Sequence, residues 1–351
     1  MSISLLSYSG IIAKVRALES NLLTESDYEK IANLDSTSDF VNFLKQNKSY
    51  AVVFNNCDET ELHRAQIELL LSNAILIEFI KLYKFANQEQ RKVLNLRLFR
   101  FEVTILKALL QMVFNKDSEY DLLAFEEFFK SHSDLKVKEL ATSKSLEEFI
   151  NNLQGTQYYD LFKRLQATSH NTLYDYEAQL DVYYFTRAWK LKDRLLTGPN
   201  RKIATEIYGR QADLLNLLWI YRSKKFFDID SNKILGTIIP INYKLKKDEI
   251  KKLVEAVSVE EFFKLVQTTY YAKLNQGIAD YNIESLYYKN FQKLYRTLST
   301  KFSTSMAPVL RFLYEKEIEL DYLTTALECI RYHLEPSQTM QYLHIDSKRI
   351  S

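Results

Sequence analysis

One pattern occurs three times in this chain of 351 residues, and it limits the possible fold more than any other feature. Each copy begins with an aliphatic residue, then has a serine, a phenylalanine and a second aliphatic residue at similar spacings, and ends at a tyrosine. The three copies are Ile31, Ser36, Phe40, Leu44 and Tyr50; Leu140, Ser145, Phe149, Leu153 and Tyr158; and Leu253, Ser258, Phe262, Val266 and Tyr270. Successive copies lie about a third of the chain apart, which is too far for a stacked solenoid repeat of roughly 20–50 residues. The pattern therefore predicts a triplicated domain, with units at 1–115, 116–228 and 229–351.

Each copy continues with two acidic positions on predicted long helices. These positions are Glu68, Glu177 and Glu284, followed by Glu102, Asp213 and Glu319. Paired carboxylates can perform acid–base catalysis. A fold needs the same position in every repeat, however, whereas an active site rarely needs three copies of one residue. We therefore interpret these six residues as helix-level ion pairs or caps.

The composition favours an all-α fold. Only six Gly and four Pro occur, and these are the residues that punctuate β-hairpins. The 24 Tyr and 21 Phe supply apolar area that helix–helix cores can bury. Thr24 and Asp27 read as the cap of a helix, and apolar residues recur with helical periodicity along most of the chain. Each repeat is predicted to contain two short helices followed by two long ones. The long ones are expected at about 61–84, 88–114, 175–197, 203–224, 281–301 and 306–333.

Charge and cysteine content exclude several classes of protein. The formal net charge of +2 is too small to favour nucleic-acid binding. Two isolated cysteines, Cys57 and Cys329, make neither a disulfide framework nor a zinc site. No apolar run reaches the eighteen or so residues that span a bilayer, and Lys14 and Arg16 interrupt the N-terminal apolar segment too early for a signal peptide. We expect a cytoplasmic chain that reaches a membrane only through another protein.

The sequence predicts no catalytic, cofactor-binding or metal site. Residues 198–202 (Gly-Pro-Asn-Arg-Lys) lack the paired glycines and the Lys-Ser/Thr of a phosphate loop, so we expect a turn between two helices. No two histidines have the spacing that places both imidazoles on one helix face. The five are His63, His132, His170, His333 and His344.

Basic residues are the remaining candidates for contact with a partner. Clusters near residues 187–194, 222–225 and 244–252 fit solvated helix faces or a docking surface for an acidic partner helix. Among helical apolar positions, four arginines stand out: Arg16, Arg187, Arg222 and Arg331. A surface guanidinium can pair bidentately with carboxylates, so we predict these four as partner-binding residues.

Three segments resemble a known family. They are Tyr8 with residues 13–19 and Leu23; residues 213–217 with Arg222 and Lys224; and residues 317–323 with 330–332. These segments are similar to the opening, the acidic-x2-Asn-Leu helix and the C-terminal helix of the C subunit of bacterial and archaeal V-type (A-type) rotary ATPases, whose eukaryotic counterpart is the d subunit. The resemblance covers about residues 8–343. Tyr322 departs from the family, which often has Asn there, and a small Gly-Lys step after the last arginine is absent.

The resemblance implies a fold of three similar helical domains around a pseudo-threefold axis, forming a funnel. It implies a non-catalytic socket in the central stalk, without a cofactor. Its partners would be the D and F subunits of the central shaft on one side and the membrane ring of proteolipid subunits on the other. Such a chain would lie at the cytoplasmic face of the membrane and couple ATP turnover to proton or sodium transport, or to ATP synthesis. Two alternatives are a cytosolic helical adaptor unrelated to rotary ATPases and a helical enzyme, for which the sequence offers no cluster of convergent polar groups.

Overall fold

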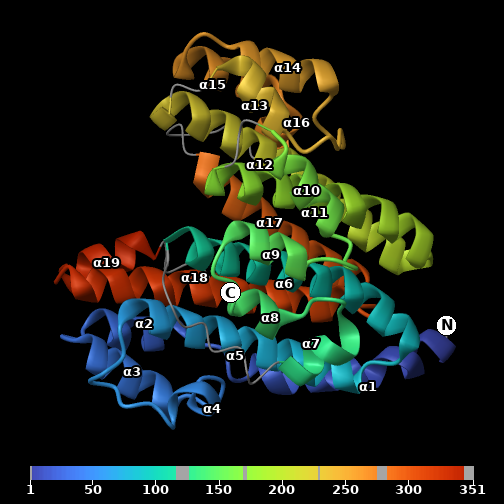
Figure 1. The fold of residues 1–351 in the computed structure, drawn as a ribbon. Helices are drawn as coiled ribbons and strands as arrows, with labels where there is room; N and C mark the ends of the chain where they lie inside the picture. Colours follow the sequence, from blue (N-terminus) through green and yellow to red (C-terminus); the bar gives the residue numbers. More distant parts are fainter. Residues whose placement is uncertain (1, 116–125, 169–171, 228–229, 275–282, 344–351) are drawn as a thin grey trace. The chain divides into compact units, whose positions relative to one another are not determined.

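The computed structural model describes residues 2–115, 126–168, 172–227, 230–274 and 283–343. Within these ranges the chain forms helices and short connections, with no strand (Figure 1). The all-α prediction is confirmed. The thin supply of Gly and Pro gives the physical reason, because the backbone contains few residues that would interrupt a helix.

The helices repeat in one order. Three short helices, which we call a head, are followed by two long helices, and this set occurs three times. The sequence predicted only two short helices per repeat; the third is a brief helix that begins beside the repeated tyrosine. The first set is α2 (Glu25–Ala32), α3 (Thr37–Gln46), α4 (Ala51–Phe54), α5 (Arg64–Phe85) and α6 (Gln88–Asn115). The second is α8 (Val137–Ala141), α9 (Leu146–Asn152), α10 (Tyr159–Gln166), α11 (Leu173–Leu195) and α12 (Gly198–Arg222). The third is α14 (Lys247–Glu255), α15 (Val259–Thr268), α16 (Tyr270–Leu274), α17 (Ile283–Lys301) and α18 (Ala307–Arg331).

Other helices precede, separate and follow these sets. They are α1 (Ser2–Glu19), α7 (Glu126–His132), the π-helical turn η2 (Ser223–Phe227), α13 (Ser231–Thr237) and α19 (Pro336–Tyr342). The turn predicted at residues 198–202 is wrong, because these residues form the start of α12. The connection between the two long helices is shorter, since α11 ends at Leu195 and α12 begins at Gly198. Pro199 lies in the first turn of α12, where its missing N–H is not needed.

The repeated serines begin the middle helix of each head. The side chains of Ser36, Ser145 and Ser258 each accept a hydrogen bond from the backbone N–H three residues later. Such a cap satisfies one of the N–H groups that a helix start leaves without a partner. Thr24 and Asp27 form the predicted capping box at α2.

The repeated apolar residues form the core of each head. Phe40, Phe149 and Phe262 are all 0% exposed, and the flanking aliphatic residues of the pattern are buried with them. The predicted tyrosine of the third copy was one residue out of register. Tyr271 is the fully buried ring, whereas Tyr270 is only partly buried.

The described structure divides into two compact units, residues 1–91 with 295–351 and residues 92–294. The first unit joins both ends of the chain, because α18 packs against α1, α2, α3 and α5, and α19 packs against α2. Its core combines head residues such as Ile31, Phe40 and Leu44 with Leu323 and Leu327 of α18. The division into 1–115, 116–228 and 229–351 stays a prediction, and residues 116–125 and 228–229, at its boundaries, lie outside the described part.

Replacing any one of the three repeated phenylalanines by alanine should destabilise the protein strongly. Each ring is fully buried, so its loss leaves a cavity, and we expect the free energy of unfolding to fall by about 3–5 kcal/mol. Phe85→Ala is the control, because that ring is 54% exposed and its loss should cost far less. Urea denaturation of the four variants measures the difference. Equal midpoints for Phe149→Ala and Phe85→Ala would contradict the assignment of the repeat core.

Candidate functional site

Each head is fastened to a long helix through a buried carboxylate and a buried tyrosine. We call these pairs acid–tyrosine junctions, and they are Glu102–Tyr158, Asp213–Tyr271 and Glu319–Tyr50. In every case the acid belongs to the last long helix of one repeat, and the tyrosine to the head of another. Glu102 reaches the second head, Asp213 the third, and Glu319 of the third repeat reaches the first head. The junctions therefore connect the three repeats in a cycle.

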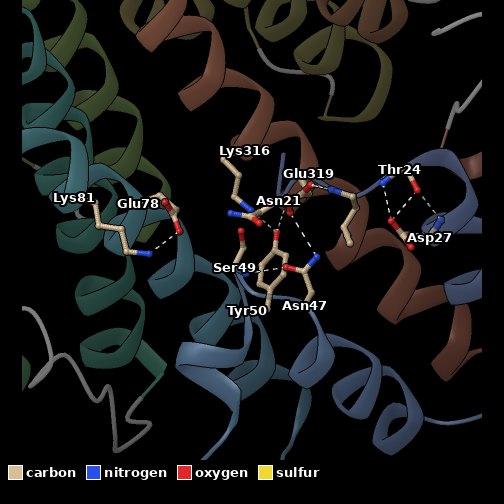
Figure 2. Close-up of polar contacts among 11 residues, drawn as sticks. Asn21, Thr24, Asp27, Asn47, Ser49, Tyr50, Glu78, Lys81, Lys316 and Glu319 are labelled. Carbon is tan, nitrogen blue, oxygen red and sulfur yellow. Dashed lines mark hydrogen bonds and ion pairs between the residues drawn. The ribbon is translucent and has the colours of Figure 1, made fainter. Parts of the chain in front are cut away.

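The Glu319–Tyr50 junction contains a buried cation (Figure 2). The Tyr50 hydroxyl donates to Glu319 Oε1 at 2.6 Å, and the Leu23 N–H donates to Glu319 Oε2 at 2.6 Å. Lys316, one turn earlier on α18, is 0% exposed and forms an ion pair with Glu319. Its ammonium also donates to the Tyr50 oxygen at 3.1 Å. Both carboxylate oxygens thus have donors, as a buried charge requires.

The Glu102–Tyr158 junction uses neutral donors. The hydroxyls of Ser133 and Tyr158 and the amide of Gln157 all donate to the Glu102 carboxylate. Burial raises the pKa of Glu102, and the hydrogen bonds from Ser133 and Tyr158 oppose that rise. The carboxylate holds together α6, the end of α7 and the second head.

The Asp213–Tyr271 junction is built largely from backbone N–H groups. Those of Lys244 and Leu245 donate to Asp213 Oδ2 at 2.6 and 3.1 Å, the Tyr243 N–H donates to Oδ1 at 3.3 Å, and the Tyr271 hydroxyl donates to Oδ2 at 2.9 Å. Asp213 is 0% exposed. One side chain therefore fixes both the segment that enters the third head and the tyrosine inside it.

Two neighbours complete the attachment of that segment to α12. The Asn216 amide donates to the Ile239 carbonyl at 3.0 Å and accepts from the Ile239 N–H at 2.9 Å, as an adjacent strand would. The absence of a Cβ on Gly209 lets the Tyr243 ring lie against the helix, since a Cβ there would stand 2.4 Å from the ring. At the position on α18 that corresponds to Asn216, Tyr322 instead packs edge-on against Tyr28, with ring centroids 5.7 Å apart. The departure from the family pattern at Tyr322 thus has a packing role.

The acidic residues divide into two groups. Glu68 pairs with Arg64 at 2.8 Å, and Glu177 accepts from Gln111 at 2.7 Å, so both make side-chain contacts near the surface. The side chain of Glu284 lies outside the described residues. Among the second set, Glu319 forms the predicted helix-level ion pair. The interpretation is wrong for the other two, because Asp213 accepts from backbone N–H groups of residues 243–245, ahead of α14, and Glu102 accepts from neutral side chains. Sequence reasoning missed the tyrosine partners, although the same pattern contained two of them, Tyr50 and Tyr158.

The four predicted partner-binding arginines all lie on exposed positions. Arg16 is on α1, Arg187 on α11, Arg222 ends α12 and Arg331 ends α18. Arg331 pairs with Glu328 at 3.1 Å. The structure places Arg16 and Arg331 in one compact unit and Arg187 and Arg222 in the other. Their role in partner binding stays a prediction.

The described histidines have local roles. His63 precedes the first residue of α5, and its backbone N–H donates a hydrogen bond to the side-chain oxygen of Gln66. The His132 ring stacks on Phe128, and His333 follows the end of α18 with a positive φ of 50°. His170 and His344 lie outside the described residues. Over the ranges that the structure covers, no three His, Cys, Asp or Glu side chains gather as metal ligands would, and no helix is both long and apolar enough to cross a bilayer.

Fold and polar contacts together define an all-helical repeat protein whose buried carboxylates fasten helices to heads. At 0–6% exposure these carboxylates are too buried to meet a substrate. Residues 11–342 match the model of the ATP synthase (C/AC39) subunit family. The chain therefore belongs to this family.

Curated relatives agree with the family match. The chain is 22% identical to the C subunit of the A-type ATP synthase of Methanocaldococcus jannaschii, over 98% of this chain and 88% of that one. It is 24% and 25% identical to the proteins of the same name from Methanosarcina mazei and Methanosarcina barkeri, in each case over 89% of this chain and 86% of the relative. The resemblance that the sequence motifs suggested is confirmed.

Asp213 should make stability depend on pH. Burial outweighs the hydrogen bonds from Lys244 and Tyr271 and raises the pKa of Asp213 from 3.8 to about 6. On acidification the folded protein thus binds this proton before the unfolded chain does. The contribution of Asp213 to the free energy of unfolding should therefore rise as pH falls from about 6 to 3.8, by about 1.4 kcal/mol per pH unit.

Asp213→Asn tests this dependence because the amide does not titrate. Denaturant unfolding of both proteins between pH 7 and 5 gives the difference in their free energies of unfolding. As pH falls, the free energy of unfolding of the wild type should rise relative to that of the variant. A difference that stays constant over this range would show that Asp213 does not titrate there.

Proposed function

We propose that this chain is a non-catalytic socket protein in the central stalk of a rotary ATPase. It would join the rotating shaft, made of the D and F subunits, to the proteolipid rotor ring in the membrane. The observation that carries this proposal is the match to the ATP synthase (C/AC39) subunit family along nearly the whole chain. Such a match disfavours the alternative of a helical adaptor unrelated to rotary ATPases.

The physical build of the chain suits a part that transmits torque. A coupler must resist twisting, so it needs close-packed helix–helix cores rather than hinges. Long helices such as α6, α12 and α18 supply such cores, and the three junctions attach a head to each of them through buried polar contacts. Buried carboxylates with full sets of donors have few alternative arrangements, because a displaced charge would lose its partners.

The same proposal gives the chain its place in the cell. It would lie at the cytoplasmic face of the membrane, held there by the ring and not by a membrane segment of its own. It would need no cofactor, since the nucleotide chemistry belongs to the catalytic head of the complex. Proton or sodium specificity would belong to the ring, so the same socket could serve transport of either ion or ATP synthesis.

Removal of this chain should separate ATP hydrolysis from ion transport. Without a socket the soluble head should still hydrolyse ATP, while the shaft no longer turns the ring. Membrane vesicles from cells that lack the chain should therefore show no ATP-driven uptake of protons or sodium, and re-addition of the purified protein should restore it. Ion uptake at the wild-type rate in its absence would overturn the proposal.

Charge reversal at the four arginines tests the partner surface. Arg16→Glu, Arg187→Glu, Arg222→Glu and Arg331→Glu should each weaken binding to the shaft or the ring, because an exposed guanidinium that pairs with a partner carboxylate would become repulsive. Arg201→Glu is the matched control, since Arg201 is also exposed but is not a predicted contact. Pull-down with purified shaft proteins and with ring-containing membranes gives the affinities, and melting temperatures show whether the variants remain folded. Wild-type affinity in all four variants would contradict the assignment.

A further inference from the structure

The first head differs from the other two in how the chain connects it to its long helix. The second head follows α6 along the chain, and the third follows α12, so each is tethered to the helix whose carboxylate it meets. The first head meets α18, which lies near the other end of the sequence. Tyr50 and Glu319 are 269 positions apart, and Leu23 and Glu319 are 296 apart. Only non-covalent contacts hold this head on α18.

Apolar contacts alone would not define one position for the head. On α18 the contacts come from Leu323, Ala326, Leu327 and Ile330, which recur with helical spacing and form an aliphatic stripe along the helix. Apolar burial is non-directional, so a stripe of similar side chains offers a comparable surface one helical turn away.

The polar cluster at this junction has no such freedom. Glu319 has donors from Leu23, Tyr50 and Lys316, and Lys316 also lies over the Tyr50 ring, 4.3 Å from its centroid. A shift by one turn would separate Glu319 from the Leu23 N–H and the Tyr50 hydroxyl, and Lys316 from Tyr50. The ion pair between Lys316 and Glu319 lies within α18 and would persist, so Glu319 Oε2 would lose its donor. Well-packed apolar residues often stabilise a core as well as a buried ion pair does, so such a pair is better explained by the arrangement that it specifies than by stability alone.

We propose that Leu23, Tyr50, Lys316 and Glu319 form a register lock, which keeps the first head in one position on α18 while the protein transmits torque. This role rests on the proposed function. Tyr50, Lys316 and Glu319 act as positioning residues, since all three are buried and contact one another. Without the lock, part of the applied torque would move the head along the helix instead of turning the ring.

An all-apolar version of the lock separates register from stability. The triple variant Tyr50→Phe, Lys316→Met, Glu319→Leu should melt at or above the wild-type temperature, yet allow the head to occupy more than one position. Spin labels at Val52→Cys on the head and Thr325→Cys on α18, in a chain with Cys57→Ser and Cys329→Ala, report that position. The wild-type lock should give one distance and the triple variant at least two. The control Lys45→Met, Glu59→Leu removes another ion pair of the same region and should keep one distance.

Tyr50→Phe keeps the test decisive if the triple variant does not fold. It removes only the hydroxyl, and the shifted population should rise about tenfold, as expected for the loss of one hydrogen bond to a charged group. A single, unchanged distance in the folded triple variant, or in Tyr50→Phe where the triple variant is unfolded, would overturn the register lock.

Ion transport tests the link to torque. In vesicles that contain the complete complex, the triple variant, or Tyr50→Phe in its place, should move fewer ions per ATP as the opposing ion gradient grows, whereas the wild type and the Lys45–Glu59 control should not. If the variant shows two distances between the spin labels but moves as many ions per ATP as the wild type, the proposed role of the lock under torque is wrong. A complex that lacks this chain is run in parallel. If it transports normally, the proposed function fails, whatever the label distances show.

Discussion

A carboxylate out of contact with water is stable only where donors satisfy it, and the attachment of the heads in this protein depends on three such groups. Each lies on a long helix and accepts from a tyrosine hydroxyl inside a head. Burial raises the pKa of Tyr50, Tyr158 and Tyr271 well above the usual value, and the neighbouring carboxylate raises it further. The hydroxyl therefore stays protonated and remains a donor.

The three junctions solve one electrostatic problem in three ways. Glu319 is balanced by a buried lysine, Asp213 by three backbone N–H groups, and Glu102 by neutral side-chain donors. The three carboxylates thus occupy the same position in their repeats but accept hydrogen bonds from different donors. The differences carry physical consequences, because a carboxylate paired with a buried lysine and one held by neutral donors respond differently to the loss of a single partner.

A cycle of junctions also explains how the ends of the chain become one structural unit. The third repeat supplies α18 to the first head, so residues 1–91 and 295–351 form a single compact body. Each repeat thereby provides a long helix on which the head of another repeat is fixed. For a member of the ATP synthase (C/AC39) subunit family, this connection of the two chain ends is compatible with a part that transmits torque.

The sequence alone determined the helical class, the three copies of the pattern, the cap at Thr24 and the burial of the repeated phenylalanines, because these follow from composition and from local spacing. It also marked Glu102, Asp213 and Glu319 as repeated acids. Tertiary structure decided what they contact. Local patterns contain no information about which helix lies over which head, so the pairing of Glu319 with Tyr50 from the opposite end of the chain could not be derived. The one-residue error at Tyr271 has a related cause, since two adjacent tyrosines differ only in which ring faces the core.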